Sequence, residues 1–205
     1  MVRAPTRRYL AGKRALDLVV CTLLLVIAIP VIAVCALAIR LDTSGPVMIA
    51  QLRTGRDGRR FRMLKLRTMV ANAEELKPQF AHLSVVPPPD FKIPNDPRIT
   101  RVGRFLRATS LDELPQLFNV LRGDMSLVGP RPTSFEPSRY ELWHTQRLDV
   151  RPGITGLWQV SGRSDVSFEE YVRLDLFYVE NWSIAYDLFI LSKTVPLLVS
   201  TRGAY

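Results

Sequence analysis

The longest apolar segment of the chain covers residues 19–39, where Thr22 is the only clearly polar side chain. As a straight helix these 21 residues would span about 31 Å, which is enough to cross the hydrocarbon core of a bilayer. Pro30 lies near the middle, where a proline removes a helical hydrogen bond and bends the helix. The pattern therefore predicts a membrane helix that is kinked at Pro30.

Basic residues flank both ends of this apolar segment. They are Arg3, Arg7, Arg8, Lys13 and Arg14 before it, and Arg40, Arg53, Arg56, Arg59, Arg60, Arg62, Lys65 and Arg67 after it. The positive-inside bias favours both flanks in the cytoplasm, which a spanning helix cannot achieve. A spanning anchor and a re-entrant helix both stay open, whereas the run is too long for a typical signal peptide. Lys13 and Asp17 are one helical turn apart, and we expect them to pair.

The next segment changes from a helical to a strand-like pattern. Residues 46–51 and 60–66 are expected to form two strands, joined by a turn at residues 55–58. The second strand carries Arg60, Arg62 and Lys65, which are either solvated or in contact with lipid phosphates. Residues 71–80 favour a short helix, and the five prolines of residues 84–97 favour an irregular loop.

Several further helices follow from the spacing of apolar positions. Along residues 99–108 a basic amphipathic helix is predicted, and its arginine stripe is either solvated or lies on lipid headgroups. The stripe consists of Arg98, Arg101, Arg104 and Arg107. Residues 135–148, 168–180 and 184–199 also favour helices, the second of them capped at its start. Residues 150–163 are rich in Gly and Pro, and we expect an irregular loop of the kind that often lines a site.

The stretch from residue 110 to residue 132 carries the candidate chemistry. Its first part looks like the start of a helix, because Ser110 can cap it and Glu113 can reach back three residues later. Gly123 is a natural stop for this helix. Pro115 in the second turn removes a hydrogen bond. Either the helix begins later, at Asp112, or its first turn is distorted.

Two adjacent carboxylates, Asp112 and Glu113, therefore lie at a helix N-terminus, where free N–H groups favour negative charge. Arg107 lies five residues upstream, and Arg131 lies in a tight Gly-Pro-Arg-Pro turn. Acids, arginines and a helix N-terminus together suit a phosphorylated substrate. Ordinary capping also accounts for such a pair, and residues 167–170 repeat the same Ser-x-x-Glu pattern.

Composition narrows the classes of partner. With 205 residues, a net charge of +9 and a pI near 10, the chain is expected to meet an anionic partner: a membrane surface, nucleic acid or a phosphorylated substrate. Cys21 and Cys35 would lie about 21 Å apart in one helix, too far to form a disulfide. His82 and His144 are isolated, so no zinc site is indicated. The sequence holds no Walker-type or dinucleotide-binding loop.

Taken together, the motifs resemble the bacterial sugar transferase family, the monotopic polyprenyl-phosphate phosphoglycosyl transferases. The resemblance covers nearly the whole chain and rests on the proline-broken apolar helix and on five ordered motifs. These motifs are Gln51-x-Arg53-x-Gly55, Lys65-Leu66-Arg67-Thr68-Met69, Arg107-x-x-Ser110-Leu111-Asp112-Glu113-Leu114-Pro115-Gln116-Leu117-x-Asn119, Gly123-Asp124-Met125-Ser126-x-Val128-Gly129-Pro130-Arg131-Pro132 and Arg151-Pro152-Gly153-Ile154-Thr155-Gly156.

The resemblance implies transfer of a sugar-1-phosphate from a UDP-sugar to undecaprenyl (polyprenyl) phosphate, with release of UMP. Asp112 would be the nucleophile that forms a covalent phosphosugar intermediate, and Glu113 would hold Mg²⁺ together with Asp112 or handle the acceptor proton. Arg107 and Arg131 would bind phosphate oxygens. Other residues of the motifs are expected to bind substrate, with the proline turn near the nucleotide: Pro130, Pro132, Lys65, Arg67, Asp124 and Arg151.

The expected fold is α+β and mostly helical, with a membrane re-entrant helix and a small cytosolic domain that contains a short β-hairpin and amphipathic interfacial helices. Residues 1–41 would form the basic tail and membrane helix, and residues 42–205 the membrane-associated catalytic domain. The resemblance implies the bacterial inner (cytoplasmic) membrane, with the catalytic domain on its cytoplasmic face and in contact with lipids, and it leaves a homodimer open.

The Gly203-Ala204-Tyr205 ending resembles hexose-1-phosphate transferases of exopolysaccharide or O-antigen pathways, which favours UDP-glucose or UDP-galactose. The alternative is a non-catalytic, membrane-tethered basic scaffold that binds anionic lipid or nucleic acid. Charge alone supports that alternative. No nucleic-acid-binding motif matches, and the bases cluster beside apolar segments, so nucleic acid is not expected as a partner.

Overall fold

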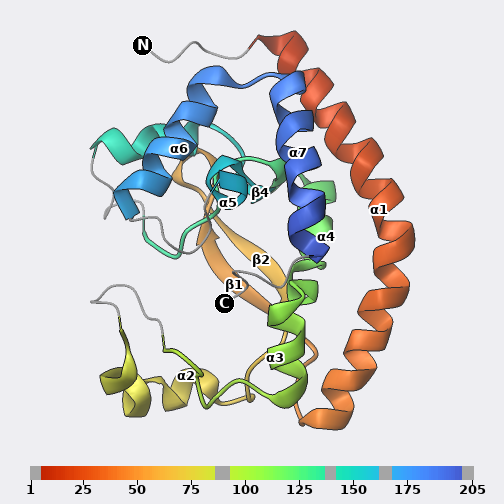
Figure 1. The fold of residues 1–205 in the computed structure, drawn as a ribbon, viewed down its shortest axis with the longest axis vertical. Coiled ribbons are helices and arrows are strands. Elements are labelled where there is room, and N and C mark those ends of the chain that lie inside the picture. Colours follow the sequence, from red (N-terminus) through yellow and green to blue (C-terminus); the bar gives the residue numbers. More distant parts are fainter. Residues whose placement is uncertain (1–5, 86–92, 137–141, 162–167, 200–205) are drawn as a thin grey trace.

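The fold is seen in a computed structural model, which describes residues 6–85, 93–136, 142–161 and 168–199 (Figure 1). The described part is mostly helical and contains two small sheets. Several features named above fall outside it: Arg3, the middle of the proline-rich loop, part of the predicted helix at residues 135–148, the cap at Ser167 and the Gly-Ala-Tyr ending.

The apolar segment lies within α1 (Arg7–Asp42), a continuous helix that Thr6 caps by accepting a hydrogen bond from the N–H of Tyr9. Pro30 lies inside it, and Figure 1 shows α1 as a bow that wraps one side of the molecule. One stripe of α1 is buried against the rest of the chain: Asp17, Cys21, Leu25, Ala28, Cys35 and Ile39. In the described part, α1 is the one helix whose length and composition would allow it to cross a membrane. Both cysteines are buried and free, as predicted.

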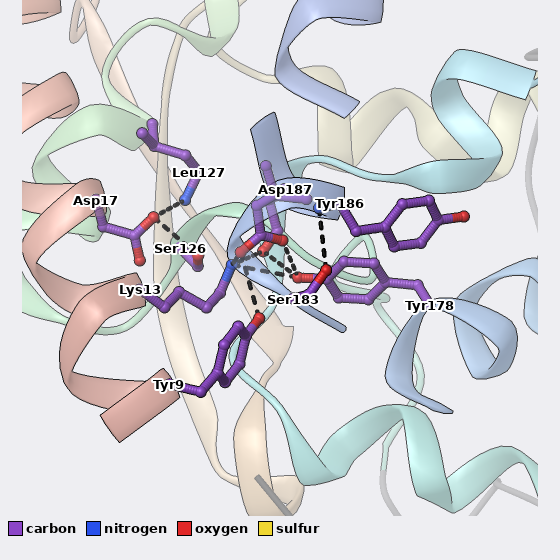
Figure 2. Close-up of polar contacts among 10 residues, drawn as sticks. Tyr9, Lys13, Asp17, Ser126, Leu127, Tyr178, Ser183, Tyr186 and Asp187 are labelled. Atoms are coloured by element: carbon purple, nitrogen blue, oxygen red, sulfur yellow. Dashed lines mark hydrogen bonds and ion pairs between the residues drawn. The ribbon is translucent and has the colours of Figure 1, made fainter. Parts of the chain in front are cut away.

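The expected pairing of Lys13 with Asp17 is wrong. Lys13 Nζ lies 2.9 Å from Asp187 Oδ2 in α7 (Ile184–Val199), whereas Asp17 Oδ1 accepts hydrogen bonds from the Ser126 hydroxyl and the Leu127 N–H, both at 3.0 Å (Figure 2). Both side chains point into the body of the molecule, where tertiary partners replace the local pair that an isolated helix would offer.

The predicted hairpin is confirmed. β1 (Met48–Thr54) pairs antiparallel with β2 (Arg60–Leu66), so that Ile49 lies opposite Lys65 and Arg53 lies opposite Phe61. The first strand runs three residues further than expected, and a 3₁₀ turn, η1 (Arg56–Gly58), joins the two. The predicted short helix after them is α2 (Ala73–Leu76), which continues as the 3₁₀ helix η2 (Lys77–Leu83).

The basic helix is present as α3 (Arg101–Ala108), which Thr100 caps at the N–H of Gly103. The prediction of one continuous arginine stripe is wrong, because the four arginines divide. Arg98 precedes the helix and is buried, with Nη2 2.6 Å from Asp96 Oδ2. Arg101 and Arg104 are exposed, and Arg107 is half-buried.

A small parallel sheet corrects the prediction of an irregular segment at residues 150–163. β3 (Ser126–Val128) pairs with β4 (Gly153–Thr155), and α5 (Leu157–Ser161) follows directly. A Cβ on Gly153 would lie 2.1 Å from the backbone nitrogen of Gly129, so the two chains approach more closely than a side chain permits. The Gly and Pro content reflects this close approach as well as loop structure.

The remaining helices surround the core. Residues 135 and 136 are not helical, and the described remainder of that predicted helix is the 3₁₀ helix η5 (Leu142–Asp149). α6 (Phe168–Asn181) and α7 lie where they were predicted. The main core joins Cys21 and Leu25 of α1 with residues of α4 (Gln116–Arg122), β3, α6 and α7. A second cluster joins Cys35 and Ile39 to Leu66 and Leu106.

Candidate active site

The carboxylate pair lies in a separate 3₁₀ turn, η3 (Leu111–Glu113), just before α4. Ser110 does not cap it through its side chain; its backbone is left-handed (φ 56°), a conformation that is uncommon for a residue other than glycine. Pro115 is the residue before α4. The distorted first turn, one of the two alternatives, is thus confirmed, and Gly123 ends the helix with φ 88° as expected.

Four residues that sequence reasoning assigned to the site do meet in space. Lys65 Nζ of β2 lies 2.8 Å from Glu113 Oε1 and 3.7 Å from Asp112 Oδ2. Arg131 contacts the same carboxylate, with Nη2 2.5 Å from Glu113 Oε1 and Nη1 3.3 Å from Oε2. Glu113 therefore holds both cations by ion pairs, one of them bidentate, while Asp112 stays beside them with weaker contact.

The two carboxylates have opposite electrostatics. Burial raises the pKa of Asp112, and the nearby Lys65 only partly offsets this rise. Burial acts on the pKa of Glu113 in the same sense, but Arg131 and Lys65 outweigh it and lower that pKa well below its ordinary value. Glu113 is thus a fixed anion, and Asp112 is a buried carboxylate whose charge is less well compensated.

Arg107 reaches the same region from α3. Its Nε donates to Thr68 Oγ1 at 2.9 Å. Burial lowers the pKa of Arg107, and the negative charge of Asp112 acts against this. Thr68 and α3 are held close together: a Cβ on Gly103 would lie 2.0 Å from the Thr68 carbonyl oxygen. Packing of α3 against the segment after β2 therefore holds Arg107 where its charge acts on Asp112.

Arg53 belongs to this region as well, although it was missed as a site residue. Arg53 lies opposite Phe61, which is four residues before Lys65 on β2. Side chains alternate between the two faces of a strand, so Arg53 lies on the same face of the hairpin as Lys65. Its Nη2 donates to Gln51 Oε1 at 3.0 Å, and its buried Nε has no hydrogen-bond partner among the described residues. Burial and then Arg131 lower its pKa. The signal in the sequence that could have revealed Arg53 was an arginine at an inward-facing position of a strand whose side chains alternate between two faces.

Other candidates lie elsewhere. Arg67 is buried and donates to the carbonyl oxygens of Thr43 (2.8 Å) and Ser44, so it fixes the connection between α1 and β1. Asp124 accepts from Asn119 Nδ2 at 3.3 Å, at the end of α4. Arg151 lines a different cavity, beside Arg14 and Trp182.

Pro130 and Pro132 are buried and flank Arg131. Together with Thr54 and Arg147 they line a cavity of about 10 Å³, which is about the space of one water molecule. These prolines therefore fix the course of the chain around Arg131 in this structure, and the cavity is too small for a nucleotide.

The ligands that the site offers to Mg²⁺ are its two carboxylates, Asp112 and Glu113. In the described ranges no three or more His, Cys, Asp or Glu side chains gather where they could hold a metal ion. Mg²⁺ commonly takes one or two carboxylates and completes its shell with water and phosphate oxygens. Asp112 offers a carboxylate of this kind, whereas the oxygens of Glu113 are held by Lys65 and Arg131. The residues fit Mg²⁺ when a diphosphate supplies further oxygens.

Comparison with known proteins identifies the family of the chain. A family model described as bacterial sugar transferase matches residues 8–201, which is nearly the whole chain. The chain belongs to the bacterial sugar transferase family.

Several curated relatives of this family member are similar over almost all of its length. It is 48% identical over 198 residues to the undecaprenyl-phosphate galactose phosphotransferase of Salmonella typhimurium, covering 94% of this chain and 41% of that protein. It is 44% identical over 202 residues to the UDP-glucose:undecaprenyl-phosphate glucose-1-phosphate transferase of Caulobacter vibrioides, covering 94% and 72%. An exopolysaccharide production protein of Rhizobium meliloti is 40% identical over 203 residues, covering 95% and 88%. The chain spans only about two fifths of the length of some of these relatives.

Proposed function

We propose that this chain transfers a sugar-1-phosphate from a UDP-sugar to undecaprenyl (polyprenyl) phosphate and releases UMP, as the first membrane step in assembly of an exopolysaccharide or a related glycan. The observation that carries the proposal is the buried Asp112 carboxylate beside Lys65 and Glu113, with Arg131 paired to Glu113 and the charges of Arg107 and Arg131 acting on Asp112. Two relatives are named for galactose or glucose phosphate transfer to undecaprenyl phosphate, which supports the same donor and acceptor classes here.

The chemistry would take two displacements at one phosphorus. First, an Asp112 oxygen attacks the phosphorus that carries the sugar, the bond from that phosphorus to the bridging oxygen breaks, and UMP leaves with the electron pair. Then an oxygen of polyprenyl phosphate attacks the same phosphorus, the bond to Asp112 breaks, and the carboxylate is regenerated. A carboxylate suits this role because it needs no deprotonation at neutral pH.

The surrounding cations would stabilise the negative charge of the transferring phosphoryl group. Lys65 is 3.7 Å from Asp112 Oδ2, and Glu113 fixes Lys65 and Arg131 relative to each other. Bound together with the diphosphate, Mg²⁺ would neutralise further charge on the phosphate oxygens. Asp112 and Glu113 are the protein groups that would hold it, Glu113 after giving up a contact to Lys65 or Arg131.

The membrane placement that we propose is a re-entrant α1 in the bacterial inner membrane, with the rest of the chain on the cytoplasmic face. The N-terminal part and the C-terminal end of α1 bind the same body: Lys13 pairs with Asp187, and Asp42 Oδ2 accepts from the N–H of Val102 at 3.2 Å. A helix that crossed the bilayer would have its ends separated by a core of about 30 Å. The outward face of α1 is apolar and exposed, with the large side chains Val19, Leu23, Leu24, Val26, Ile27, Ile29, Val34, Leu37 and Leu41.

The test is UMP release by the purified, detergent-solubilised chain with Mg²⁺, polyprenyl phosphate and a panel of UDP-sugars. We expect release with UDP-glucose or UDP-galactose that depends on the acceptor for multiple turnovers. Failure to release UMP with every member of the panel, while the chain still binds vesicles of anionic lipid, would instead favour a non-catalytic scaffold. A homodimer remains a prediction that light scattering on the same preparation can check.

A further inference from the structure

A second cavity, of about 40 Å³, lies beside the N-terminal part of α1. It is built from segments far apart in the sequence, with Arg14 and Asp17 from α1, Arg56 from η1, Arg151 before β4 and Trp182 between α6 and α7. One buried water needs about 10–15 Å³ on the same measure, so the cavity has room for about three waters, or for a small oxyanion. We call it the arginine pocket.

Two of its arginines meet over Gly123. A Cβ on that glycine would lie 3.7 Å from Arg14 Nη2 and 3.9 Å from Arg151 Nη2, so the two guanidinium groups are within about 8 Å of each other. Arg14 is held in place because Nη1 donates to the Val120 carbonyl at 2.6 Å and Nη2 to the Leu121 carbonyl at 2.8 Å.

Four cations line this pocket, against two acids: Lys13, Arg14, Arg56 and Arg151 against Asp17 and Asp149. Lys13 is paired with Asp187 and Arg56 with Asp57, so the excess of positive charge lies on Arg14 and Arg151. Burial, then Arg14, then Arg56 lower the pKa of Arg151, and the negative charge of Asp17 acts against them. Asp17 Oδ1 already accepts hydrogen bonds from the hydroxyl of Ser126 and the N–H of Leu127. The other acid that lines the pocket, Asp149, is exposed. A cluster of like charges with partial burial is costly unless an anion occupies it.

We propose that the arginine pocket binds a phosphate group, separately from the site at Asp112. The depth of the pocket relative to the bilayer favours a lipid headgroup as the source of this phosphate. Arg14 precedes the apolar segment by five residues, about 7.5 Å along a helix axis, and headgroups extend about 5–7 Å beyond each side of the hydrocarbon core. Trp182 at the rim is a residue type enriched at that depth. This depth estimate rests on the membrane placement proposed above, whereas the charge and geometry of the pocket do not.

Trp182 offers a local reporter for the test. In a chain with Trp143→Phe and Trp158→Phe, we would follow Trp182 fluorescence in dodecyl maltoside micelles, which contain no phosphate. Separate titrations would add dihexanoyl phosphatidylglycerol, inorganic phosphate, or sodium chloride to matched ionic strength. The same titrations would be run with Arg151→Gln and with Arg101→Gln, which removes an equal charge from the exposed face of α3, and again in an Asp112→Asn background.

We expect a saturable change that Arg151→Gln weakens at least tenfold, that Arg101→Gln leaves intact, and that persists with Asp112→Asn. Saturation by the lipid alone identifies a headgroup phosphate, and saturation by inorganic phosphate identifies a free anion. No response beyond that of sodium chloride, or equal responses with and without Arg151, overturns the proposal. If the double Phe chain does not fold, shifts in Tm of the chain with all three tryptophans, compared between Arg151→Gln and Arg101→Gln, make the same distinction. Because the readout is binding in a chain that lacks Asp112, its outcome is independent of whether UMP is released.

Discussion

At the scale of single residues, the site pairs a stabilised acid with a destabilised one. Glu113 is neutralised by Arg131 and Lys65, whereas Asp112 is buried at 3.7 Å from Lys65, and its pKa is raised by burial. A reactive group that costs stability is common at catalytic positions, because function and stability place different demands on the same residue.

The first prediction follows from the raised pKa of Asp112. Since the folded pKa lies above the unfolded value, stability is complete at pH values below the unfolded pKa and is lost as the pH rises through the folded pKa. Asp112→Asn removes this loss. We expect a higher Tm for Asp112→Asn at pH 7.5, by about 2–4 °C for each kcal/mol gained, and a difference that shrinks toward pH 4.

Thermal unfolding of both proteins across that pH range measures the effect. Asp57→Asn is the control, because Asp57 is exposed and its left-handed backbone (φ 55°) suits Asn. A lower Tm for Asp112→Asn at neutral pH would mean that the carboxylate stabilises the fold.

The second prediction concerns Arg53, whose buried Nε has no hydrogen-bond partner among the described residues and whose pKa responds to the charges of Arg131 and Glu113. If it binds a phosphate oxygen of the donor, Arg53→Gln loses a charged hydrogen bond worth about 1.5–3 kcal/mol. We expect kcat/KM for the UDP-sugar to fall about ten- to hundredfold. Arg62→Gln, on the exposed face of the same hairpin, is the matched control; equal losses in both variants would contradict a role for Arg53.

At the scale of elements, local pattern predicted what local forces decide. The long apolar helix, the hairpin, α6 and α7 follow from hydrophobic spacing and turn residues. The pattern failed where tertiary contacts prevail. Arg98 has the spacing of a solvated stripe but is buried against Asp96, and residues 153–155 look like a loop but pair with β3 because Gly153 and Gly129 approach so closely.

The same limit applies to the site. Asp112, Glu113, Lys65 and Arg131 were found because their motifs resemble a family, not because capping spacing distinguishes them from the similar pattern at residues 167–170. Arg67 and Arg151 stand in equally specific motifs but bind elsewhere in the structure. A motif identifies residues that matter, and only the fold separates those that face the chemistry from those that fix the backbone.

The third prediction concerns the contact between α1 and α7. Lys13 donates to Asp187, to the Val128 carbonyl at 2.9 Å and to the Tyr178 hydroxyl at 3.2 Å, while Tyr9 and Tyr178 both donate to Asp187 (Figure 2). Burial and the charge of Asp187 raise the pKa of Tyr178, so it stays a neutral donor. Breaking a buried ion pair from one side typically costs about 3–5 kcal/mol, because the other charge is left alone.

We therefore expect Lys13→Met and Asp187→Asn each to lower the free energy of unfolding by about 3 kcal/mol, and the double variant to lose clearly less than the sum. Denaturant unfolding of the four proteins in one detergent completes the cycle. Strict additivity would show that the two charges act independently.

At the scale of the whole molecule, α1 packs into the same body that, in our proposal, it attaches to the membrane. Its buried stripe joins both hydrophobic clusters, its ends are hydrogen-bonded to β3 and α3, and its outward face is apolar. The sequence alone left a spanning and a re-entrant helix open. The basic residues that flank the apolar segment do not reveal that the rest of the chain packs along α1.

The fourth prediction is that both ends of α1 lie in the cytoplasm. Cysteines introduced at Thr6 and at Ser44, two exposed positions beyond the ends of the helix, should both resist an impermeant thiol reagent in intact cells and react after permeabilisation. The chain without these changes is the control, since Cys21 and Cys35 are buried. Labelling of one site from outside, with the other protected, would indicate a spanning helix.

The fifth prediction concerns covalent catalysis by Asp112. The purified chain, given Mg²⁺ and an accepted UDP-sugar without polyprenyl phosphate, should release one equivalent of UMP, and mass spectrometry should find a hexose-phosphate increment on the peptide that contains Asp112. Asp112→Asn keeps the size of the side chain but lacks the anionic nucleophile, so both burst and adduct should vanish. Substantial turnover by Asp112→Asn, or an adduct on Glu113, would contradict this assignment of the nucleophile.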